Sequence, residues 1–539
     1  MVADAALQEQ KNDFSKWLAL FVVVIGTFMA MLDSSIVNIA IPKMMSVFGV
    51  SLDSVKWILT CYTLAMGAIT PLTGYLSDRF GSKKLYVFSL GLFTVGSLLC
   101  GFAWSNSSMI LFRIIQALGG GMIMPVGMTM IMQIFPPNER GLALGFWGIS
   151  SMAAPAIGPT LGGYIIQYLD WRLIFNVNVP IGVFGVIMAG ILLRETPKKE
   201  VKGFDLFGFI TSSGGIACIL YVLGEGSNID WGDIKNPIFL TLGIFGLILF
   251  VVNELTVPNP LLELRIFKTY NFTLSQIITC FTTMALMGGT YVLPLFLQNI
   301  RGYTAMQTGE TLFLSAVASG LMMPLSGALT DRFGPKAVTV TGLSIVAFAS
   351  YQLTFLDMNT TREFIMWTAC YRGIGLGLAM MPVNTTGMND VPQHLMSKAT
   401  PLSTVIRMIM SSVSVTIMTT LLTSRNNENF ARLSEQINVF NPAAGDTVKM
   451  LQGAYMQYGL TQNEAQSSAL SSIAGLLQGQ AYIDAMDYAL AVTSVTIVIA
   501  IGLVLLMNTA HVKKRDRMQK QGKEEATYET EAGMAAIIE

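Results

Sequence analysis

The 539-residue sequence has little charge, only two histidines and only five cysteines. Charged residues make up 12% of it, against about 25% in ordinary soluble domains, and hydrophobic residues make up 52%. A chain this long with so few charges cannot cover a surface that faces water, so lipid must cover much of it. The composition indicates an integral membrane protein.

These absences also exclude several classes of function. No G-x-x-x-x-G-K-[ST] motif is present and no nucleophile stands with a base, so we expect neither ATP as the fuel nor an enzyme. The formal net charge is zero and no basic stretch alternates with stacking aromatics, which argues against a nucleic-acid partner. All five cysteines fall in apolar runs, which indicates buried thiols rather than disulfides. We expect no cofactor and no metal.

Fourteen apolar segments of about 20 residues or more predict membrane-spanning helices, and hence an all-α fold. They lie at roughly 17–41, 55–76, 84–104, 108–132, 141–166, 172–193, 204–223, 236–254, 271–298, 307–329, 336–356, 363–384, 400–424 and 482–507. The polar start of the chain leads into a long span, so no removable signal peptide is predicted.

The basic residues predict the orientation, because cytoplasmic loops collect Lys and Arg. With the N-terminus inside, 21 of the 33 basic residues fall on the inner side, and the loop at 225–236 is outside and acidic. We therefore expect a multi-pass protein of the cell membrane with both termini in the cytoplasm. Residues 425–481 then form a long outer segment, interpreted either as a tolerated surface insertion or as a helix over the outer mouth.

One charged turn occurs twice. PLTGYLSDRFGSK (71–83) returns as PLSGALTDRFGPK (324–336), with nine of thirteen positions identical at an offset of 253 residues. The arginine-bearing spans FRIIQALGGGMIMP (112–125) and YRGIGLGLAMMP (371–382) echo the same duplication. Such repeats build one class of secondary transporters from two halves of six spans. The predicted units are an N-terminal bundle (1–200), two extra spans (201–260), C-terminal spans 9–13 (261–424), an outer loop (425–481), a last span (482–507) and a cytoplasmic tail (508–539).

The turn GYLSDRFGSKK resembles the inner-loop signature of the major facilitator superfamily. Nearly the whole chain is similar to the fourteen-span drug:proton antiporter branch of that superfamily. Besides the turn, three stretches carry this resemblance: LDSSIVNIAIP (32–42), the segment Arg113–Gln116, and GPTLGGYIIQYLDWRLIFNVNVP (158–180). The chain departs from the family pattern at Ala117, where glycine is usual. The resemblance implies alternating access between two pseudo-symmetric bundles, with two additional central helices.

Asp33 is the only acid well inside the N-terminal bundle. A charge at the bilayer centre costs about 2.5–3.5 kcal/mol, so Asp33 is expected to face a cavity or a partner. Counted along their helices, Asp33 and Arg113 both lie in the outer half of the bundle, within reach of each other. We predict that Asp33 carries the coupling proton with Arg113 beside it and Glu310 as a second candidate; the alternative is a static ion pair.

The two DRFG turns predict an inner gate. Asp78 and Asp331 are placed to accept hydrogen bonds from helices of the opposite half, beginning near Lys398–Thr400 and Arg140–Gly141 respectively. The arginines would latch the two halves, and positive charge that sets topology is an additional role. The predicted gate residues are Gly74, Asp78, Arg79, Gly81, Lys83, Gly327, Asp331, Arg332 and Gly334.

Small residues in APAIGPTLGG (154–163) permit close helix approach, while two prolines bend the helix. The pattern resembles the antiporter signature of the fifth span; an ordinary tight crossing is the alternative. Its members are Pro155, Gly158, Pro159, Gly162 and Gly163.

The resemblance also implies a substrate cavity between the halves, although methionine stripes are more often simple packing. The candidates that line it are Met29, Tyr62, Gln116, Phe146, Trp147, Phe281, Met284, Met287, Tyr291, Arg372 and Arg407. The expected function is proton-driven export of hydrophobic or cationic small molecules. A dedicated exporter of one metabolite, antibiotic or lipid, or a receptor or scaffold without transport, are the alternatives. An adaptor protein is compatible with the sequence but not implied.

Overall fold

The chain was analysed as a computed structural model that describes residues 2–136, 139–196, 203–226, 229–435, 437 and 442–508. Every regular element in those residues is helical. The predicted tail (508–539) lies outside the described residues, apart from Asn508.

The N-terminal half is a bundle of long helices joined by short turns. Its helices are α1 (Val2–Phe48), α2 (Leu52–Ile69), α3 (Leu72–Phe80), α4 (Ser82–Gly101), α5 (Asn106–Ile134), α6 (Arg140–Tyr168), α7 (Leu173–Asn176) and α8 (Asn178–Leu192). The axis bends by 54° between α2 and α3, next to Pro71, which has no backbone N–H to continue the helix. The chain then reverses at Gly81, whose φ of +95° favours glycine.

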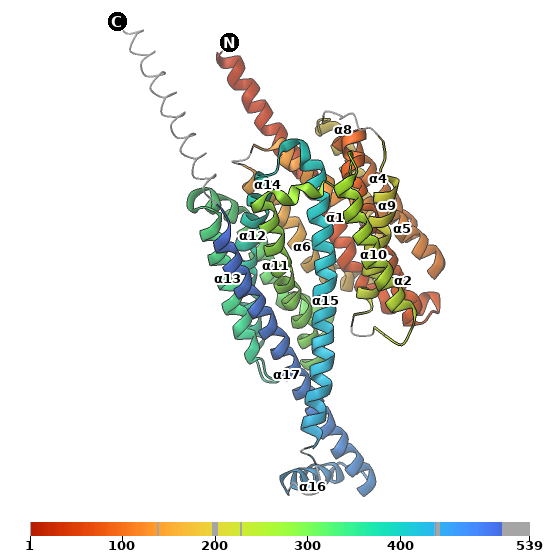
Figure 1. Ribbon diagram of the computed structural model, residues 1–539. Helices are drawn as coiled ribbons and strands as arrows, with labels where there is room; N and C mark the ends of the chain where they lie inside the picture. Colours follow the sequence, from red (N-terminus) through yellow and green to blue (C-terminus); the bar gives the residue numbers. More distant parts are fainter. Residues whose placement is uncertain are drawn as a thin grey trace.

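Two further helices follow, α9 (Leu206–Gly224) and α10 (Lys235–Thr256). Both are long and apolar enough to cross a membrane. They pack as a hairpin, with Gly246 of α10 against the backbone of α9 at Thr211 and Gly215. On its other side α9 meets both halves: Ser213 donates to the Ala68 carbonyl of α2, and Thr416 of α15 donates to the Leu223 carbonyl of α9. The hairpin therefore lies beside the bundles, in contact with each half (Figure 1).

The C-terminal half repeats the plan of the first. Its helices are η2 (Leu264–Lys268), α11 (Tyr270–Leu295), η3 (Phe296–Ile300), α12 (Ala305–Phe333), α13 (Pro335–Gln352), η4 (Leu353–Phe355), α14 (Arg362–Asn389), η5 (Gln393–Leu395), α15 (Met396–Glu435), α16 (Pro442–Gln457) and α17 (Gln462–Leu506). A second glycine with positive φ, Gly334 at +83°, ends α12 where Gly81 ends α3. Twelve helices, the bent α2–α3 pair and the 29-residue α6 together occupy the fourteen predicted spans.

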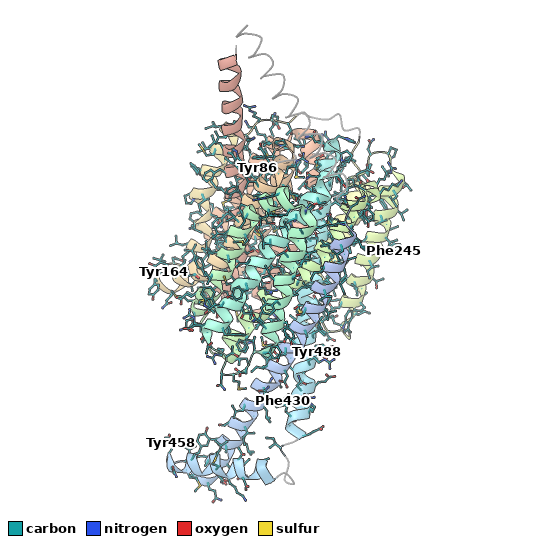
Figure 2. All side chains as sticks on the ribbon, turned by 90° about the vertical axis from the view of Figure 1, so that its left-hand side faces the viewer. Tyr86, Tyr164, Phe245, Phe430, Tyr458 and Tyr488 are labelled. Carbon is teal, nitrogen blue, oxygen red and sulfur yellow. The ribbon has the colours of Figure 1, made fainter. Side chains whose placement is uncertain are left out.

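The described part of 425–481 is mostly helical, as the helical periodicity within it predicts, and not the loop of the predicted domain division. The helix of the thirteenth span continues to Glu435, and the last helix begins at Gln462, twenty residues before the predicted boundary. Both helices project beyond the bundle, and α16 lies across their ends; these parts are named here the projection (Figure 2). Figure 2 labels Phe430 and Tyr458 on the projection, and Tyr488 where the projection joins the bundle. The two long helices hold each other there, because Gln478 donates to Asn426 and the Arg425 guanidinium stacks on Tyr488.

The halves make close contacts toward the end of the bundle that holds both ends of the described chain, named here the basic side (Figure 1). A Cβ on Gly145 of α6 would lie 2.6 Å from the Pro324 Cα of α12, and one on Gly327 would lie 2.5 Å from the Gly141 carbonyl carbon. Thr129 of α5 hydrogen-bonds to Thr400 of α15, and Arg140 donates to Asn389 at 3.0 Å. The basic side is closed in this conformation.

Candidate functional site

A buried ion pair forms the centre of the N-terminal half. Arg113 Nη1 of α5 donates to Asp33 Oδ2 of α1 at 2.6 Å, and both side chains are 0% exposed. The prediction that Asp33 and Arg113 approach each other is confirmed in this geometry. A charge pair without water is stabilised only where other polar groups complete its hydrogen bonds.

Two side-chain amides complete the shell of the carboxylate. Gln116 Nε2 donates to Asp33 Oδ1 at 2.8 Å and to the Ser97 hydroxyl oxygen at 2.6 Å, while Gln116 Oε1 accepts from Arg113 at 2.7 Å. Asn178 Nδ2, at the start of α8, donates to the same Asp33 oxygen at 3.1 Å. The acid is thus held by one guanidinium and two amides, which orient it and balance its charge.

The face of Arg113 is covered by an aromatic ring. Its guanidinium carbon lies 3.8 Å from the centroid of the Tyr62 ring, and Nε and Nη2 have no hydrogen-bond partner. Stacking on a ring compensates part of the desolvation of a cation. Tyr62 and Gln116, both predicted as substrate contacts, therefore belong to the ion-pair site in this conformation.

Small residues of the predicted antiporter motif bring α6 against α1 beside Asp33. A Cβ on Gly158 would collide with the Ser35 hydroxyl, and one on Gly162 would lie 2.8 Å from Ile36 Cγ1. Gly163 has open space around it. The side chains of Pro155 and Pro159 lie outside the described residues. Helices α6 and α1 therefore cross closely, at residues of α1 that lie next to Asp33 along the chain.

The predicted gate pairs the expected helices. A Cβ on Gly74 would lie 2.6 Å from the Ser397 carbonyl oxygen at the start of α15, and Gly327 meets Gly141 at the start of α6. Asp78 is buried on α3; the side chain of Asp331 lies outside the described residues. Lys83 contributes its backbone N–H, which with that of Ser82 donates to Glu195 and Thr196 and so caps the turn after Gly81.

The gate arginines differ from the prediction. Arg79 donates to the Tyr75 hydroxyl of its own helix and lies over the rings of Tyr75 and Phe80, and Arg332 lies over Phe333. None of these contacts of Arg79 and Arg332 reaches the opposite half, whereas close glycine contacts and the Thr129–Thr400 and Arg140–Asn389 hydrogen bonds join the halves on this side. The long, flexible arginine side chain can make a cation–π contact with an aromatic ring in or next to its own helical turn without reaching another helix.

The charged candidates of the C-terminal half do not join one cluster. Glu310 pairs with Arg362 at 3.2 Å, and both side chains are nearly half exposed, so Glu310 lacks the enclosed setting of Asp33. Arg372 of α14 is buried and donates to the backbone carbonyls of Ala285 and Leu286 on α11. Arg407 is a partly buried residue of α15.

The apolar cavity candidates fall into three groups. Met29 and Trp147 are buried in the core between the halves, where Trp147 donates to the Thr27 hydroxyl at 2.9 Å. Phe281, Met284, Met287 and Tyr291 are partly buried along α11. Phe146 is 40% exposed and packs edge-on against Trp17, outside the buried core that holds Trp147.

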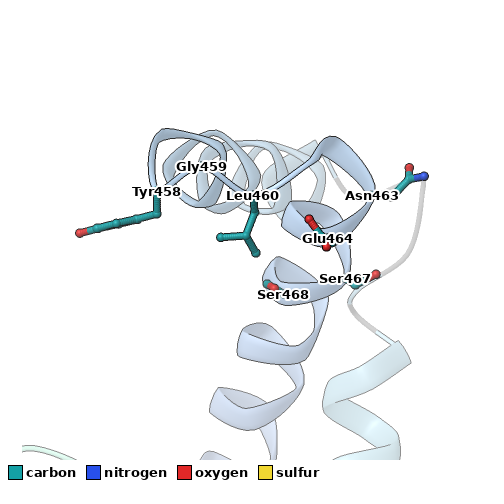
Figure 3. A pocket seen from close by; sticks show the side chains of 7 residues that line it. All are labelled: Tyr458, Gly459, Leu460, Asn463, Glu464, Ser467 and Ser468. Atoms are coloured by element: carbon teal, nitrogen blue, oxygen red, sulfur yellow. The ribbon is translucent and has the colours of Figure 1, made fainter.

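Two surface pockets lie outside this centre. One of 310 Å³ is lined by Tyr291, by Ser411 and Ser412 of α15, and by the end of α9 around Glu225. The other, shown in Figure 3, lies on the projection at the turn between α16 and α17 and is lined by Tyr458, Glu464 and their neighbours. The first borders the predicted cavity residues, whereas the second is far from the ion pair.

Comparison with known proteins identifies the family. A family model described as Major Facilitator Superfamily matches residues 23–415. The chain belongs to the major facilitator superfamily. The uncharacterized transporter YhcA of Bacillus subtilis is 35% identical over 96% of this chain and 97% of its own. The multidrug export protein EmrB of Escherichia coli K12 is 32% identical over 85% and 90%.

A solved structure supports the fold of this superfamily member. That of the human organic anion transporter MFSD10 has a TM-score of 0.58 and covers 91% of this chain and 99% of its own. At 10% identity, it bears on the fold alone.

Sequence reasoning missed two members of the site, Asn178 and Ser97. Asn178 falls in the stretch 158–180 that carries the family resemblance, and a polar amide at the start of an apolar span was the available signal. Ser97 is one of several serines and threonines in its span, so nothing in the sequence distinguished it.

Proposed function

We propose that this superfamily member is a proton-coupled antiporter that exports hydrophobic small molecules by alternating access. The observation that carries the proposal is the fully buried carboxylate of Asp33, held by Arg113, Gln116 and Asn178. The relationship to a multidrug export protein supports it. We also propose that the basic side, which holds both described chain ends, faces the cytoplasm.

In this mechanism Asp33 binds a proton from outside and releases it inside. Arg113 compensates the carboxylate when the proton leaves, so the buried site is never left with an isolated negative charge. Gln116 and Asn178 hold the carboxylate in one orientation through both states. Substrate favours the deprotonated form, which couples its export to proton entry.

The available driving force is sufficient for concentrative export. A pH difference of one unit supplies about 1.4 kcal/mol per proton. A potential of 100 mV adds about 2.3 kcal/mol for each net charge moved.

The test is transport in proteoliposomes with an imposed pH gradient and a panel of hydrophobic compounds. Asp33→Asn mimics the protonated form, so we expect it to lose uphill transport and substrate-induced proton release. Glu428→Gln, at an exposed acid on the projection, is the matched control and should retain both. Persistence of both activities in Asp33→Asn would show that the coupling proton binds elsewhere. If many unrelated compounds compete with the transported compound, the result favours multidrug export. If only one compound competes, the result favours a dedicated exporter.

A further inference from the structure

We propose that Glu254 holds a proton at the base of the α9–α10 hairpin and that this proton keeps the basic side closed. The site is separate from Asp33, and it makes the opening of that side respond to pH. The inference rests on the proposed function and orientation, since it adds regulation by cytoplasmic pH to proton-driven export. The regulation is a feedback, because each transport cycle admits protons and an acidified cytoplasm then holds the inner side closed.

Glu254 is a carboxyl group that is enclosed in protein and only half satisfied. It lies three residues from the end of α10 and is 0% exposed. Its Oε2 accepts from the Leu262 N–H at 3.2 Å, whereas its Oε1 is buried without a hydrogen-bond partner. A carboxylate removed from water is stable only where a cation or several donors surround it. The neutral acid therefore fits this setting better than the carboxylate.

A second carboxyl group meets Glu254 on the side of its unpaired oxygen. A Cβ on Gly208 would lie 2.9 Å from Glu254 Oε1 and within the same distance of Asp205 Oδ2, so the two oxygens border one small space. Asp205 is fully satisfied, because it accepts from the Gly208 N–H and from Asn253 Nδ2. Two carboxylates that share a site cannot both be ionised at low cost. Asp205 therefore carries the negative charge, and Glu254 carries the proton.

Two charged groups face Glu254 from the helices around it. They are Asp205 at the start of α9 and Lys398 at the start of α15. The Lys398 ammonium donates to the Pro260 carbonyl at 2.9 Å, so its hydrogen bond goes to the backbone and not to the carboxyl group. Other charged residues on neighbouring elements have partners of their own, namely Glu263 with Arg265 and Arg79 with Tyr75.

The base of the hairpin is joined to the helices that close the basic side. The segment between α10 and η2 gives its Leu262 N–H to Glu254 and its Pro260 carbonyl to Lys398, so it ties α10 to α15. A Cβ on Gly74 of α3 would lie 3.5 Å from the Lys398 Cα, in the contact that closes this side. Loss of the proton places a second negative charge at the base. That charge requires water or the Lys398 ammonium, and either one disturbs the tie at the start of α15.

The sign of the pH response follows from this arrangement. The closed conformation encloses the neutral acid, so it binds the proton more tightly than a conformation in which water reaches the base. By linkage, acid favours the closed conformation and alkali favours its opening. Glu254→Gln keeps the shape of the neutral acid but cannot titrate, so we expect it to hold the basic side closed at every pH.

The test uses the full chain with Asp33→Asn, named here the parent, so that titration of Asp33 does not contribute. Spin labels at Lys84 and Ala337 report the separation of the halves on the basic side, in nanodiscs from about pH 5 to about pH 9. In the parent we expect the population with the longer distance to grow as the pH rises. Adding Glu254→Gln should abolish this growth. Glu263→Gln, at an acid that pairs with Arg265, is the matched control and should preserve it.

Infrared difference spectra between low and high pH detect the proton itself. The parent should show the C=O stretching band of a carboxylic acid that is lost at high pH, and Glu254→Gln should remove that band while Glu263→Gln keeps it. The proposal is overturned by distances that do not change with pH in the parent, by opening in acid, or by an unchanged response in Glu254→Gln. Failure here leaves proton coupling at Asp33 intact, and failure of the transport test leaves this pH response intact, because the parent already lacks the Asp33 carboxylate.

Discussion

At the scale of single residues, the Asp33–Arg113 pair is surrounded by polar and aromatic groups that contact both the pair and one another. Each Asp33 oxygen accepts at least one hydrogen bond, Gln116 contacts both charges, and Tyr62 covers the guanidinium face. Removing one member leaves its partner buried and incompletely compensated, whereas removing both charges does not. The energetics of the site are therefore strongly coupled.

Arg113→Gln should lower the free energy of unfolding by about 3–5 kcal/mol, because it leaves the Asp33 carboxylate buried without a counter-charge. The double variant Asp33→Asn, Arg113→Gln should recover a large part of that loss. Denaturant unfolding of the unchanged protein, the two single variants Asp33→Asn and Arg113→Gln, and the double variant measures this coupling. Additive effects of the two substitutions would contradict a coupled pair.

At the scale of helices, close contacts between backbones decide which side of the protein is closed. Gly74 lets α3 touch the start of α15, and Gly327 lets α12 touch the start of α6, so both halves use the same device at equivalent turns. A side chain at either position must separate the helices, because the nearest atoms are backbone and cannot rotate away.

Gly74→Val should shift the protein away from the conformation closed on the basic side. Spin labels at Lys84 and Ala337, exposed positions on that side of the two halves, report the separation by electron–electron distance measurement. We expect a longer distance in the variant. Gly190→Ala, where a Cβ meets nothing within 4 Å, is the control, and the same distance distribution in all three proteins would rule out this role for Gly74.

The hairpin of α9 and α10 depends on one acid at its base. Asp205 Oδ1 accepts from the Gly208 N–H at 2.7 Å and caps α9, while Oδ2 accepts from Asn253 Nδ2 of α10 at 2.6 Å. Asp205→Ala removes the cap and the tie together, so we expect a loss of about 0.5–2 kcal/mol in the free energy of unfolding. Denaturant unfolding measures it, with Asp446→Ala, at an exposed acid of α16, as reference. Equal stability of the two variants would argue against Asp205 as the anchor.

The whole molecule is two similar bundles with a lateral hairpin and a helical projection on the side opposite the described chain ends (Figure 1). The turn between α9 and α10 lies on the side of the projection, so its position reports the orientation of the protein in the membrane. Both added helices are long and apolar enough to cross the bilayer.

Cysteines introduced at Asp230 and Lys235 should react with a membrane-impermeant maleimide added outside intact cells. A cysteine at Lys84, on the basic side, should react only after the cells are opened. The physical reason is the excess of Lys and Arg in the loops of that side, which are retained in the cytoplasm. Labelling in the reverse pattern would invert the proposed orientation.

Periodicity and composition were sufficient to predict the helical fold, because lipid requires long apolar helices whose backbone groups bond internally. The 253-residue repeat was sufficient to predict the pairing of helices at Gly74 and Gly327, because duplicated segments fold alike. Asp33 and Arg113 stood out because charges at membrane depth are costly and hence rare.

Only the tertiary structure decided how those charges are completed. Asn178 and Ser97 are ordinary polar residues along the chain. Asn178 reaches Asp33 only because α8 packs beside α1, and Ser97 reaches Gln116 only because α4 packs beside α5. It also decided that the arginines of the gate turn to their own aromatic neighbours, and that the outer segment continues two helices instead of forming a loop. The physical reason is the same in each case: side-chain partners depend on distances between helices, and sequence periodicity specifies which face of a helix is apolar but not which neighbour it meets.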